Sequence, residues 1–197
     1  MSAGTKNDVR SVAFNLPNQL TWARLLLAVV LFCVIPLRLY LLSLVLFVVA
    51  AATDWLDGYF ARKYGLVTTL GRILDPFVDK VIVCGTFIYL ASIEHSGIHA
   101  WMAVIVVGRE LLITALRSFL EQQGADFSAA LSGKLKMVLQ CIAAGLSLYY
   151  LYLSPSDGAI GPNWLATLVA VAAWAAVAMT VISGIAYVRT AIGLFRQ

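Results

Sequence analysis

Six long apolar stretches limit what this chain can fold into. They lie near residues 20–37, 39–60, 74–93, 98–120, 134–153 and 164–188. An apolar helix of about 18 or more residues can cross the ~30 Å hydrocarbon core of a bilayer. Because 61% of the residues are hydrophobic and 12% are charged, with a mean hydropathy of +0.89, an ordinary soluble domain is excluded. We predict an all-α integral membrane bundle of six transmembrane helices, forming a single domain over residues 1–197.

A short polar segment precedes the first stretch. Residues 1–19 contain no compact apolar region followed by a cleavage site, so we expect no signal peptide and a first helix that stays attached as an anchor. The segment is predicted to be cytoplasmic or interfacial, with Trp22 and Arg24 at the headgroup level. Asn18, Thr21 and Arg24 fit either this interfacial entry or a contact with substrate.

The basic residues are distributed unevenly between the two sides of the predicted bundle. Of the fourteen Lys and Arg residues, only Arg38 falls on the side opposite the termini. Basic residues concentrate on the cytoplasmic side of membrane proteins. We therefore predict that both termini and the loops at 61–73 and 121–135 face the cytoplasm.

Four aspartates stand inside two of the apolar stretches. Asp54 and Asp57 are i,i+3 neighbours on a helix, and Asp75 and Asp79 are i,i+4 neighbours, so each pair shares a helix face. Two such helices facing each other would bring four carboxylates together. Unpaired anions in an apolar setting are costly, whereas Mg²⁺, Mn²⁺ or Ca²⁺ would neutralise them and accept their hard oxygen ligands. The pattern predicts a metal site.

Small and phosphate-binding residues follow the first aspartate pair. Gly58 and Ala61 would let a backbone or a flat ligand come close to the acidic residues. Arg62 suits a phosphate, although it is also a suitable counter-ion for the carboxylates. Thr68 is interpreted as a hydroxyl donor to ligand, and Thr69 as a helix cap.

A second polar group lies in the fourth and fifth stretches. Arg109 and Glu110 are deep in an apolar segment, where charged residues are functional candidates by default, although a purely structural Arg–Glu pair is the competing interpretation. Lys134 and Lys136 could be ordinary basic flanks of a cytoplasmic helix end, but with Arg109 and Arg117 they predict a basic concavity near the acidic cluster. Such a pocket indicates an anionic co-substrate.

The remaining features are interpreted as structural. The last stretch lacks interior charge and is predicted to be scaffold or a dimer surface. The three cysteines lack pairing or ligand spacing and are expected to be small core residues. His95 and His99 are assigned no ligand role. Aromatic residues are expected in interfacial belts, among them Trp101, Tyr149, Tyr150, Tyr152, Trp164 and Tyr187.

The spacing of the acidic segment resembles a known family signature. The segment 54–79 matches the pattern D-x2-D-G-x2-A-R-x8-G-x3-D-x3-D of the CDP-alcohol phosphatidyltransferases without departure. The matching residues are Asp54, Asp57, Gly58, Ala61, Arg62, Gly71, Asp75 and Asp79. The six-span layout also fits that family. Three further segments resemble the phosphatidylglycerophosphate synthase branch of that family: residues 15–24, residues 108–110 with Arg117, and residues 133–136.

The resemblance implies a reaction and a set of roles. CDP-diacylglycerol and sn-glycerol 3-phosphate would give phosphatidylglycerophosphate and CMP, with two Mg²⁺ or Mn²⁺ ions required. Asp54, Asp57 and Asp75 would hold the metals, and Asp79 would complete the second site and act as base on the acceptor hydroxyl. The CDP-lipid would bind at Asn18, Thr21, Gly58, Ala61, Arg62 and Thr68. Glycerol phosphate would bind at Arg109, Arg117, Lys134 and Lys136.

The reaction joins a lipid to a water-soluble acceptor, so we expect the site at the cytoplasmic face of a bacterial inner membrane. The family suggests a homodimer, and no nucleic-acid partner is expected. Two alternatives remain. The acceptor could be inositol phosphate, phosphatidylglycerol or serine, although the basic residues argue against serine. A divalent-cation transporter also explains intramembrane aspartates, but it leaves Gly58, Ala61, Arg62 and the basic residues without a role.

Overall fold

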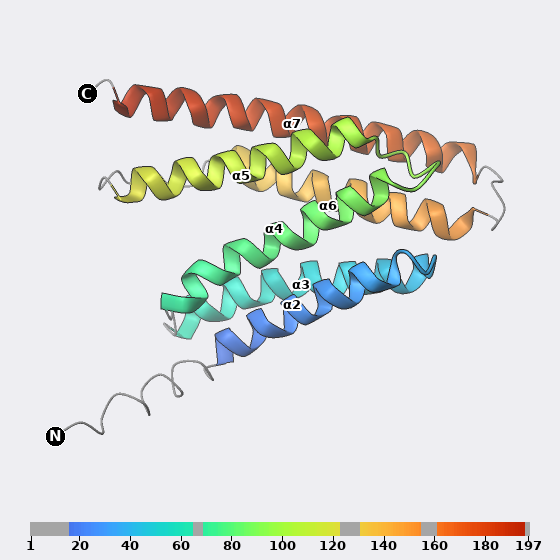
Figure 1. The fold of residues 1–197 in the computed structure, drawn as a ribbon, viewed down its shortest axis with the longest axis horizontal. Helices are drawn as coiled ribbons and strands as arrows, with labels where there is room; N and C mark the ends of the chain where they lie inside the picture. The colour runs from blue at the N-terminus through green and yellow to red at the C-terminus, as the bar shows by residue number, and fades with distance from the viewer. Residues whose placement is uncertain (1–15, 65–68, 123–130, 155–160, 196–197) are drawn as a thin grey trace. The chain divides into compact units, whose positions relative to one another are not determined.

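The computed structural model describes the backbone of residues 16–64, 69–122, 131–154 and 161–195, and side chains at 22–53, 77–78, 80–120, 135–154 and 161–193. Over this part of the chain it contains six α-helices and no strand (Figure 1). Each predicted stretch overlaps one helix, which confirms the all-α prediction. The helices are α2 (Leu16–Val34), α3 (Tyr40–Tyr64), α4 (Thr69–Ala91), α5 (Ala100–Gln122), α6 (Leu131–Leu153) and α7 (Asn163–Phe195).

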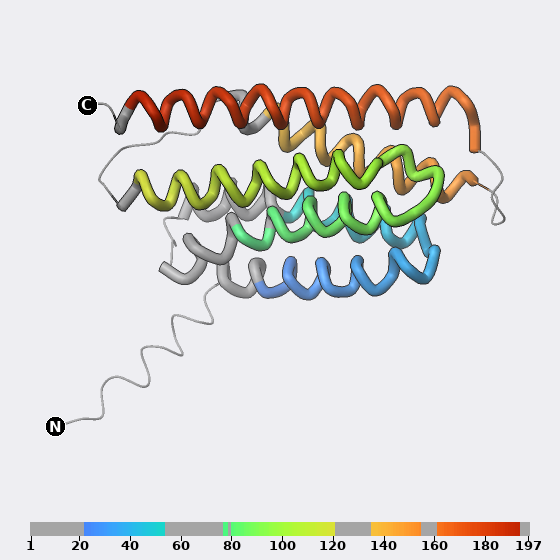
Figure 2. The backbone as a smooth tube through the Cα atoms, turned by 45° about the horizontal axis from the view of Figure 1, so that its top comes forward, coloured from blue at the N-terminus to red at the C-terminus, as the bar shows by residue number. Residues whose placement is uncertain are grey.

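The chain divides into two compact units, residues 1–85 and 86–197, with the boundary inside α4. In the first unit α2 packs against α3 (Figures 1 and 2). A short turn joins them, in which Arg38 adopts a left-handed conformation with φ of 58°. At Gly85 on α4, an added Cβ atom would collide with the ring of Phe32 on α2. The missing side chain therefore allows these two helices to approach closely.

In the second unit α5 and α6 both pack against α7. The buried faces of α6 and α7 are rich in small residues, since Ala143, Ala144, Ala173 and Ala176 are all 0% exposed. Small side chains let helix backbones come close where lipid offers no hydrophobic driving force. Gln140 of α6 adds a buried hydrogen bond by donating to Thr180 Oγ1 of α7 at 2.9 Å.

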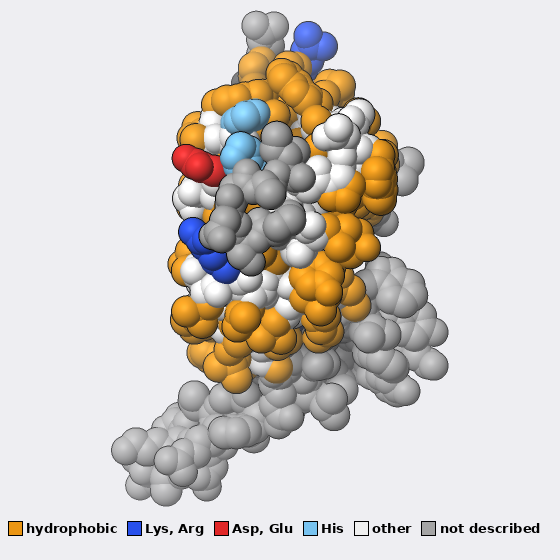
Figure 3. All heavy atoms as spheres, turned by 90° about the vertical axis from the view of Figure 1, so that its right-hand side faces the viewer, with side chains coloured by type: hydrophobic (Ala, Val, Ile, Leu, Met, Phe, Trp, Pro, Cys, Tyr) orange, Lys and Arg blue, Asp and Glu red, His pale blue; other side chains and the backbone are white. Residues whose placement is uncertain are grey.

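Much of the described surface is apolar. On the face shown in Figure 3, most described side chains are hydrophobic. Residues 135–153 and 163–193 form two helices long and apolar enough to cross a membrane. Exposed fractions of half or more occur at large apolar residues of α5 and α7, namely Val104, Leu111, Leu112, Trp164, Val171, Trp174 and Ile182. Water-soluble monomers rarely expose so many large apolar side chains together, so lipid is the suitable solvent for these helices.

Two helix ends differ from the prediction. α7 continues to Phe195, seven residues beyond 188. α4 begins at Thr69 rather than near 74, so Pro76 lies in the helix interior. Proline there cannot supply the N–H that the Arg72 carbonyl would receive in a regular helix.

Two predictions about side-chain burial were wrong. Cys33 is exposed on α2 rather than in the core, while Cys84 and Cys141 are partly buried. Tyr150 is 3% exposed and packs with Leu165 and Val169 of α7 instead of joining an interfacial belt. Both positions reflect which face of the helix meets a neighbour, and apolar composition alone does not determine that face.

The loop between α4 and α5 is tightly constrained. Ser96 Oγ accepts a hydrogen bond from Ile98 N at 3.2 Å, and Ser147 Oγ of α6 donates to the Ser96 carbonyl at 2.6 Å. Gly97 has φ of 75°, and a Cβ atom there would lie 2.5 Å from Val169 Cγ1. The loop thus requires glycine both for its backbone and for its contact with α7.

We expect Gly97→Ala to lower the thermal unfolding midpoint in detergent by several degrees. An L-residue in the left-handed region costs about 1–2 kcal/mol, and the contact with Val169 adds to that cost. Gly193→Ala is the matched control, because no atom lies within 4 Å of the added Cβ on α7. Equal midpoints for the two variants would contradict this interpretation of the loop.

Candidate active site

The four aspartates are in helical segments, as their spacing predicted. Asp54 and Asp57 are in α3, and Asp75 and Asp79 are in α4. All four belong to the first unit. Helical spacing puts each pair about one turn apart on its helix. Their side chains lie outside the described residues, so the convergence of the four carboxylates stays a prediction. Their chemistry, four hard oxygen donors, fits Mg²⁺ or Mn²⁺.

The predicted CDP-lipid residues fall on the same unit. Asn18 and Thr21 are in the first two turns of α2, and Gly58, Ala61 and Arg62 are in the last turns of α3. The structure gives these five residues helical backbone, and their side chains lie outside the described residues. Thr68 lies outside the described residues altogether. Their role in binding stays a prediction.

The burial of Arg24 differs from the prediction that this residue lies at the headgroup level. It is 1% exposed on α2, whereas Trp22 two residues earlier is 53% exposed. A buried arginine in an apolar bundle is costly unless its charge is compensated, so such residues mark functional or paired positions. Of the two interpretations left open by the sequence, burial favours an interior role for Arg24.

The second unit contains a buried ionic cluster of Arg109, Glu110 and Lys136, which we call the α5–α6 ion cluster. Lys136 Nζ of α6 donates to Glu110 Oε1 of α5 in a close contact. Arg109 Nη1 donates to the same Oε1 at 3.2 Å, and lies 3.4 Å from Oε2. The side chains of Arg109, Glu110 and Lys136 are 10%, 6% and 7% exposed. One carboxylate oxygen therefore holds two cations.

Arg109 is also fixed from the side of α7. Its guanidinium carbon lies 5.4 Å from the centre of the Tyr187 ring, a distance at which the ring face attracts a cation. Tyr187 is 8% exposed and packs in a core cluster with Ile113, Leu120 and Ala191. The prediction that Tyr187 belongs to an interfacial belt was wrong, because the residue faces α5 inside the unit.

The other two predicted basic residues are not part of the α5–α6 ion cluster as described. Arg117 is exposed and lies eight residues after Arg109, about 12 Å along the axis of α5. The side chain of Lys134 lies outside the described residues. The structure thus joins Arg109 and Lys136 through Glu110, a residue that the sequence interpretation did not assign to a ligand.

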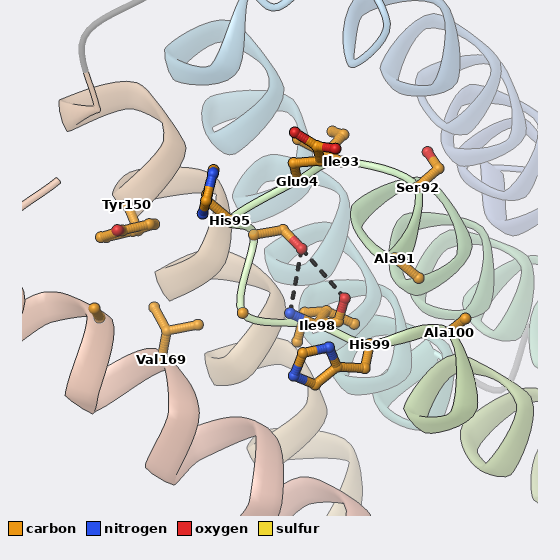
Figure 4. A pocket seen from close by; sticks show the side chains of 13 residues that line it. Ala91, Ser92, Ile93, Glu94, His95, Ile98, His99, Ala100, Tyr150 and Val169 are labelled. Carbon is orange, nitrogen blue, oxygen red and sulfur yellow. Dashed lines mark hydrogen bonds between the residues drawn. The ribbon is translucent and has the colours of Figure 1, made fainter. Parts of the chain in front are cut away.

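A cavity lies at the far end of α6 from Lys136. It has a volume of about 410 Å³ and is lined by the loop Ser92–His99 and by Tyr150 and Val169 (Figure 4). Lys136 and Tyr150 are 14 residues apart on α6, which corresponds to ~21 Å. His95 and His99 line this cavity, and among the described side chains no group of three metal-ligating residues occurs. The cavity is therefore separate from the α5–α6 ion cluster.

These features define a helical membrane protein with paired aspartates on two helices and a buried basic cluster on two others. The model of the family described as CDP-alcohol phosphatidyltransferase matches residues 14–187. The chain belongs to this family.

Curated relatives cover most of the chain. It is 36% identical over 190 residues to the CDP-diacylglycerol–glycerol-3-phosphate 3-phosphatidyltransferase of Bacillus subtilis, covering 88% of this chain and 93% of the relative. The enzyme of the same name from Rickettsia typhi is 35% identical over 177 residues, covering 88% and 94%. The Haemophilus influenzae enzyme is 36% identical over 139 residues, covering 67% and 74%.

Proposed function

We propose that this chain transfers the phosphatidyl group of CDP-diacylglycerol to sn-glycerol 3-phosphate, giving phosphatidylglycerophosphate and CMP. The observation that carries the proposal is the similarity to curated enzymes named for this reaction, such as the Bacillus subtilis relative, over 88% of the chain. The partly buried Arg109 and the buried Lys136 support it, because a phosphorylated acceptor requires cations.

The acidic residues are assigned to two divalent ions, Mg²⁺ or Mn²⁺. Asp54, Asp57 and Asp75 would hold the ions, and Asp79 would complete the second site. Such ions, when bound, neutralise the diphosphate and stabilise the leaving CMP. Asp79 would also accept the proton of the attacking hydroxyl, as a carboxylate near a nucleophile can do. The helical spacing of both pairs supports these assignments.

The two substrates are assigned to different residues. The CDP-lipid would contact the start of α2 and the end of α3, through Asn18, Thr21, Gly58, Ala61, Arg62 and Thr68. The phosphate of the acceptor would contact Arg109 and Lys136, with Arg117 and Lys134 as further cations. Arginine presents a planar fork that matches phosphate oxygens, whereas lysine acts as a point charge. The acceptor hydroxyl must be placed in line with the leaving CMP.

We also propose that all six helices cross the membrane as one domain over residues 1–197. The shortest, α2, has 19 residues and a length of ~28 Å, close to the thickness of the hydrocarbon core. With Arg38 alone on the opposite side, the termini and active site would face the cytoplasm of a bacterial inner membrane. A homodimer is proposed from the family resemblance.

An acceptor panel tests the function. Purified protein is given CDP-diacylglycerol and Mg²⁺ with glycerol 3-phosphate, inositol phosphate, serine or phosphatidylglycerol, and CMP release is measured. We expect glycerol 3-phosphate to give the highest kcat/KM. Faster CMP release with another acceptor would replace the proposed substrate.

A cation transporter is tested in the same preparation. Uptake of Mn²⁺ into protein-containing liposomes, without turnover of CDP-lipid, would support a transporter and contradict the transferase. The proposed function predicts turnover and no uptake above that of empty liposomes.

A further inference from the structure

Glu110 is the buried carboxylate at the centre of the α5–α6 ion cluster. It is 5% exposed, as is Lys136, and the two residues are 26 positions apart on different helices. Its Oε1 atom accepts from both Lys136 Nζ and Arg109 Nη1. Glu110 is therefore the group through which the positions of the two cations depend on each other.

The cluster has an excess of positive charge among its own three members, since Arg109 and Lys136 face one carboxylate. Two cations brought together in a poorly solvated region repel each other strongly, because the local dielectric constant is low. A carboxylate between them offsets this repulsion and fixes their geometry. The summed charge of these three side chains is positive, which suits an anion as a neighbour.

The surroundings fix Arg109 without neutralising it. Tyr187 offers the face of its ring, and a Cβ atom at Gly184 of α7 would be 3.4 Å from Arg109 Cγ, so α7 packs directly against the stem of the side chain. Arg109 Nε is buried and has no hydrogen-bond partner among the described residues. A polar N–H in such a position is costly unless a ligand or water completes its bonding. The guanidinium is thus held in place while part of its bonding capacity remains available.

We propose that Glu110 is a positioning residue for the acceptor phosphate: it holds Lys136 Nζ and the Arg109 guanidinium at a fixed separation so that both can bind one phosphate group. This inference rests on the proposed function. Glu110 acts through the two cations and does not itself contact the anion, because a carboxylate would repel it. Its loss should weaken binding of the phosphorylated acceptor and leave binding of the CDP-lipid nearly unchanged.

The test compares KM values for the two substrates in purified Glu110→Gln. The glutamine keeps the size of the side chain but loses the charge that holds two cations together. We expect KM for glycerol 3-phosphate to rise roughly 10- to 100-fold, the range for loss of charged hydrogen bonds, and KM for CDP-diacylglycerol to change by about twofold or less. Equal increases in both KM values, or no increase, would overturn the proposal.

A matched control separates positioning from folding. Gln140→Leu removes another buried polar side chain of α6, one turn after Lys136, and breaks its bond to Thr180. It should lower thermal stability but leave both KM values within about twofold of wild type. If Gln140→Leu raised KM for glycerol 3-phosphate as much as Glu110→Gln does, the effect would belong to helix packing and the proposal would fail.

A double-variant comparison tests whether Glu110 acts through Lys136. If it does, adding Glu110→Gln to Lys136→Met should raise KM for glycerol 3-phosphate by much less than Glu110→Gln does in the wild-type chain. Independent, multiplicative effects would contradict the proposal. Should Glu110→Gln fail to fold, Glu110→Asp gives the same test, since it keeps the charge but is too short to hold both cations, and a smaller selective rise is expected.

The same assays separate failure of this inference from failure of the proposed function. Absence of phosphatidylglycerophosphate from the wild-type chain would remove the proposed function. Wild-type turnover with glycerol 3-phosphate, together with an unchanged KM in Glu110→Gln, would remove only the role of Glu110.

Discussion

Asp79→Asn should abolish measurable CMP release from CDP-diacylglycerol and glycerol 3-phosphate. The proposed function makes Asp79 both a metal ligand and the group that accepts the proton of the attacking hydroxyl. Loss of a general base alone lowers kcat by about 10²–10⁴-fold, and loss of a charged metal ligand adds to this. Binding of the nucleotide should largely persist, because the other three aspartates and the CDP-lipid residues are unchanged.

The measurement is CMP release at saturating substrates, with CDP-lipid binding followed separately by ligand-induced thermal stabilisation. Glu94→Gln is the matched control, since Glu94 is an exposed carboxylate in the loop after α4. It should turn over at the wild-type rate. Normal turnover in Asp79→Asn would refute the assignment of Asp79, whatever the control gives.

Arg109→Ala should raise KM for glycerol 3-phosphate about 10²-fold and change KM for CDP-diacylglycerol far less. The side chain is held by Glu110 at 3.2 Å and by the Tyr187 ring, so it is ordered before substrate arrives. An ordered arginine loses little entropy on binding phosphate, and its charged hydrogen bonds are worth about 1.5–3 kcal/mol each.

Arg189→Ala serves as the control for Arg109→Ala, because Arg189 is an exposed arginine of α7 two residues after Tyr187. Initial rates are measured while each substrate is varied at a saturating level of the other. Equal effects of Arg109→Ala on both substrates would argue against an acceptor pocket at the α5–α6 ion cluster.

The helices could be predicted because apolar stretches of this length have few alternatives. In lipid the backbone must satisfy its own hydrogen bonds, and a helix does so within one segment. The ends were harder to predict. The third apolar stretch indicated a helix start near residue 74, yet α4 begins at Thr69 and continues through Pro76.

Long-range contacts could not be read from the sequence. Asp54 and Asp57, like Asp75 and Asp79, are local neighbours, so helical periodicity was enough to pair them. Glu110 and Lys136 are on separate helices, and no i,i+4 pattern joins them. The sequence did offer Glu110 as a partner of Arg109, because the two residues are adjacent. The contact between Tyr187 and Arg109 could not be predicted, because it depends on which face of α7 meets α5. That face is determined by packing.

Burial of single charges was also beyond the sequence pattern. Arg24 is near the start of the first apolar stretch, where a headgroup position and an interior position are compatible with the same local sequence. Its exposed fraction of 1% distinguishes them. A signal that could have indicated this is the four-residue spacing from Arg24 to Ala28 and on to Phe32, which continues the inward face of α2 where Ala28 is 0% exposed.

The metal-dependent transfer of a phosphatidyl group can be followed with glycerol 3-phosphate labelled in its glycerol carbon. Purified protein is incubated with this substrate, CDP-diacylglycerol and Mg²⁺, with and without a chelator, and the label is followed into the lipid phase alongside CMP. We expect one labelled lipid for each CMP released, with both products lost in the chelator and restored by Mg²⁺ or Mn²⁺. CMP release with the label remaining in the aqueous phase, or label transfer that the chelator does not reduce, would contradict this expectation.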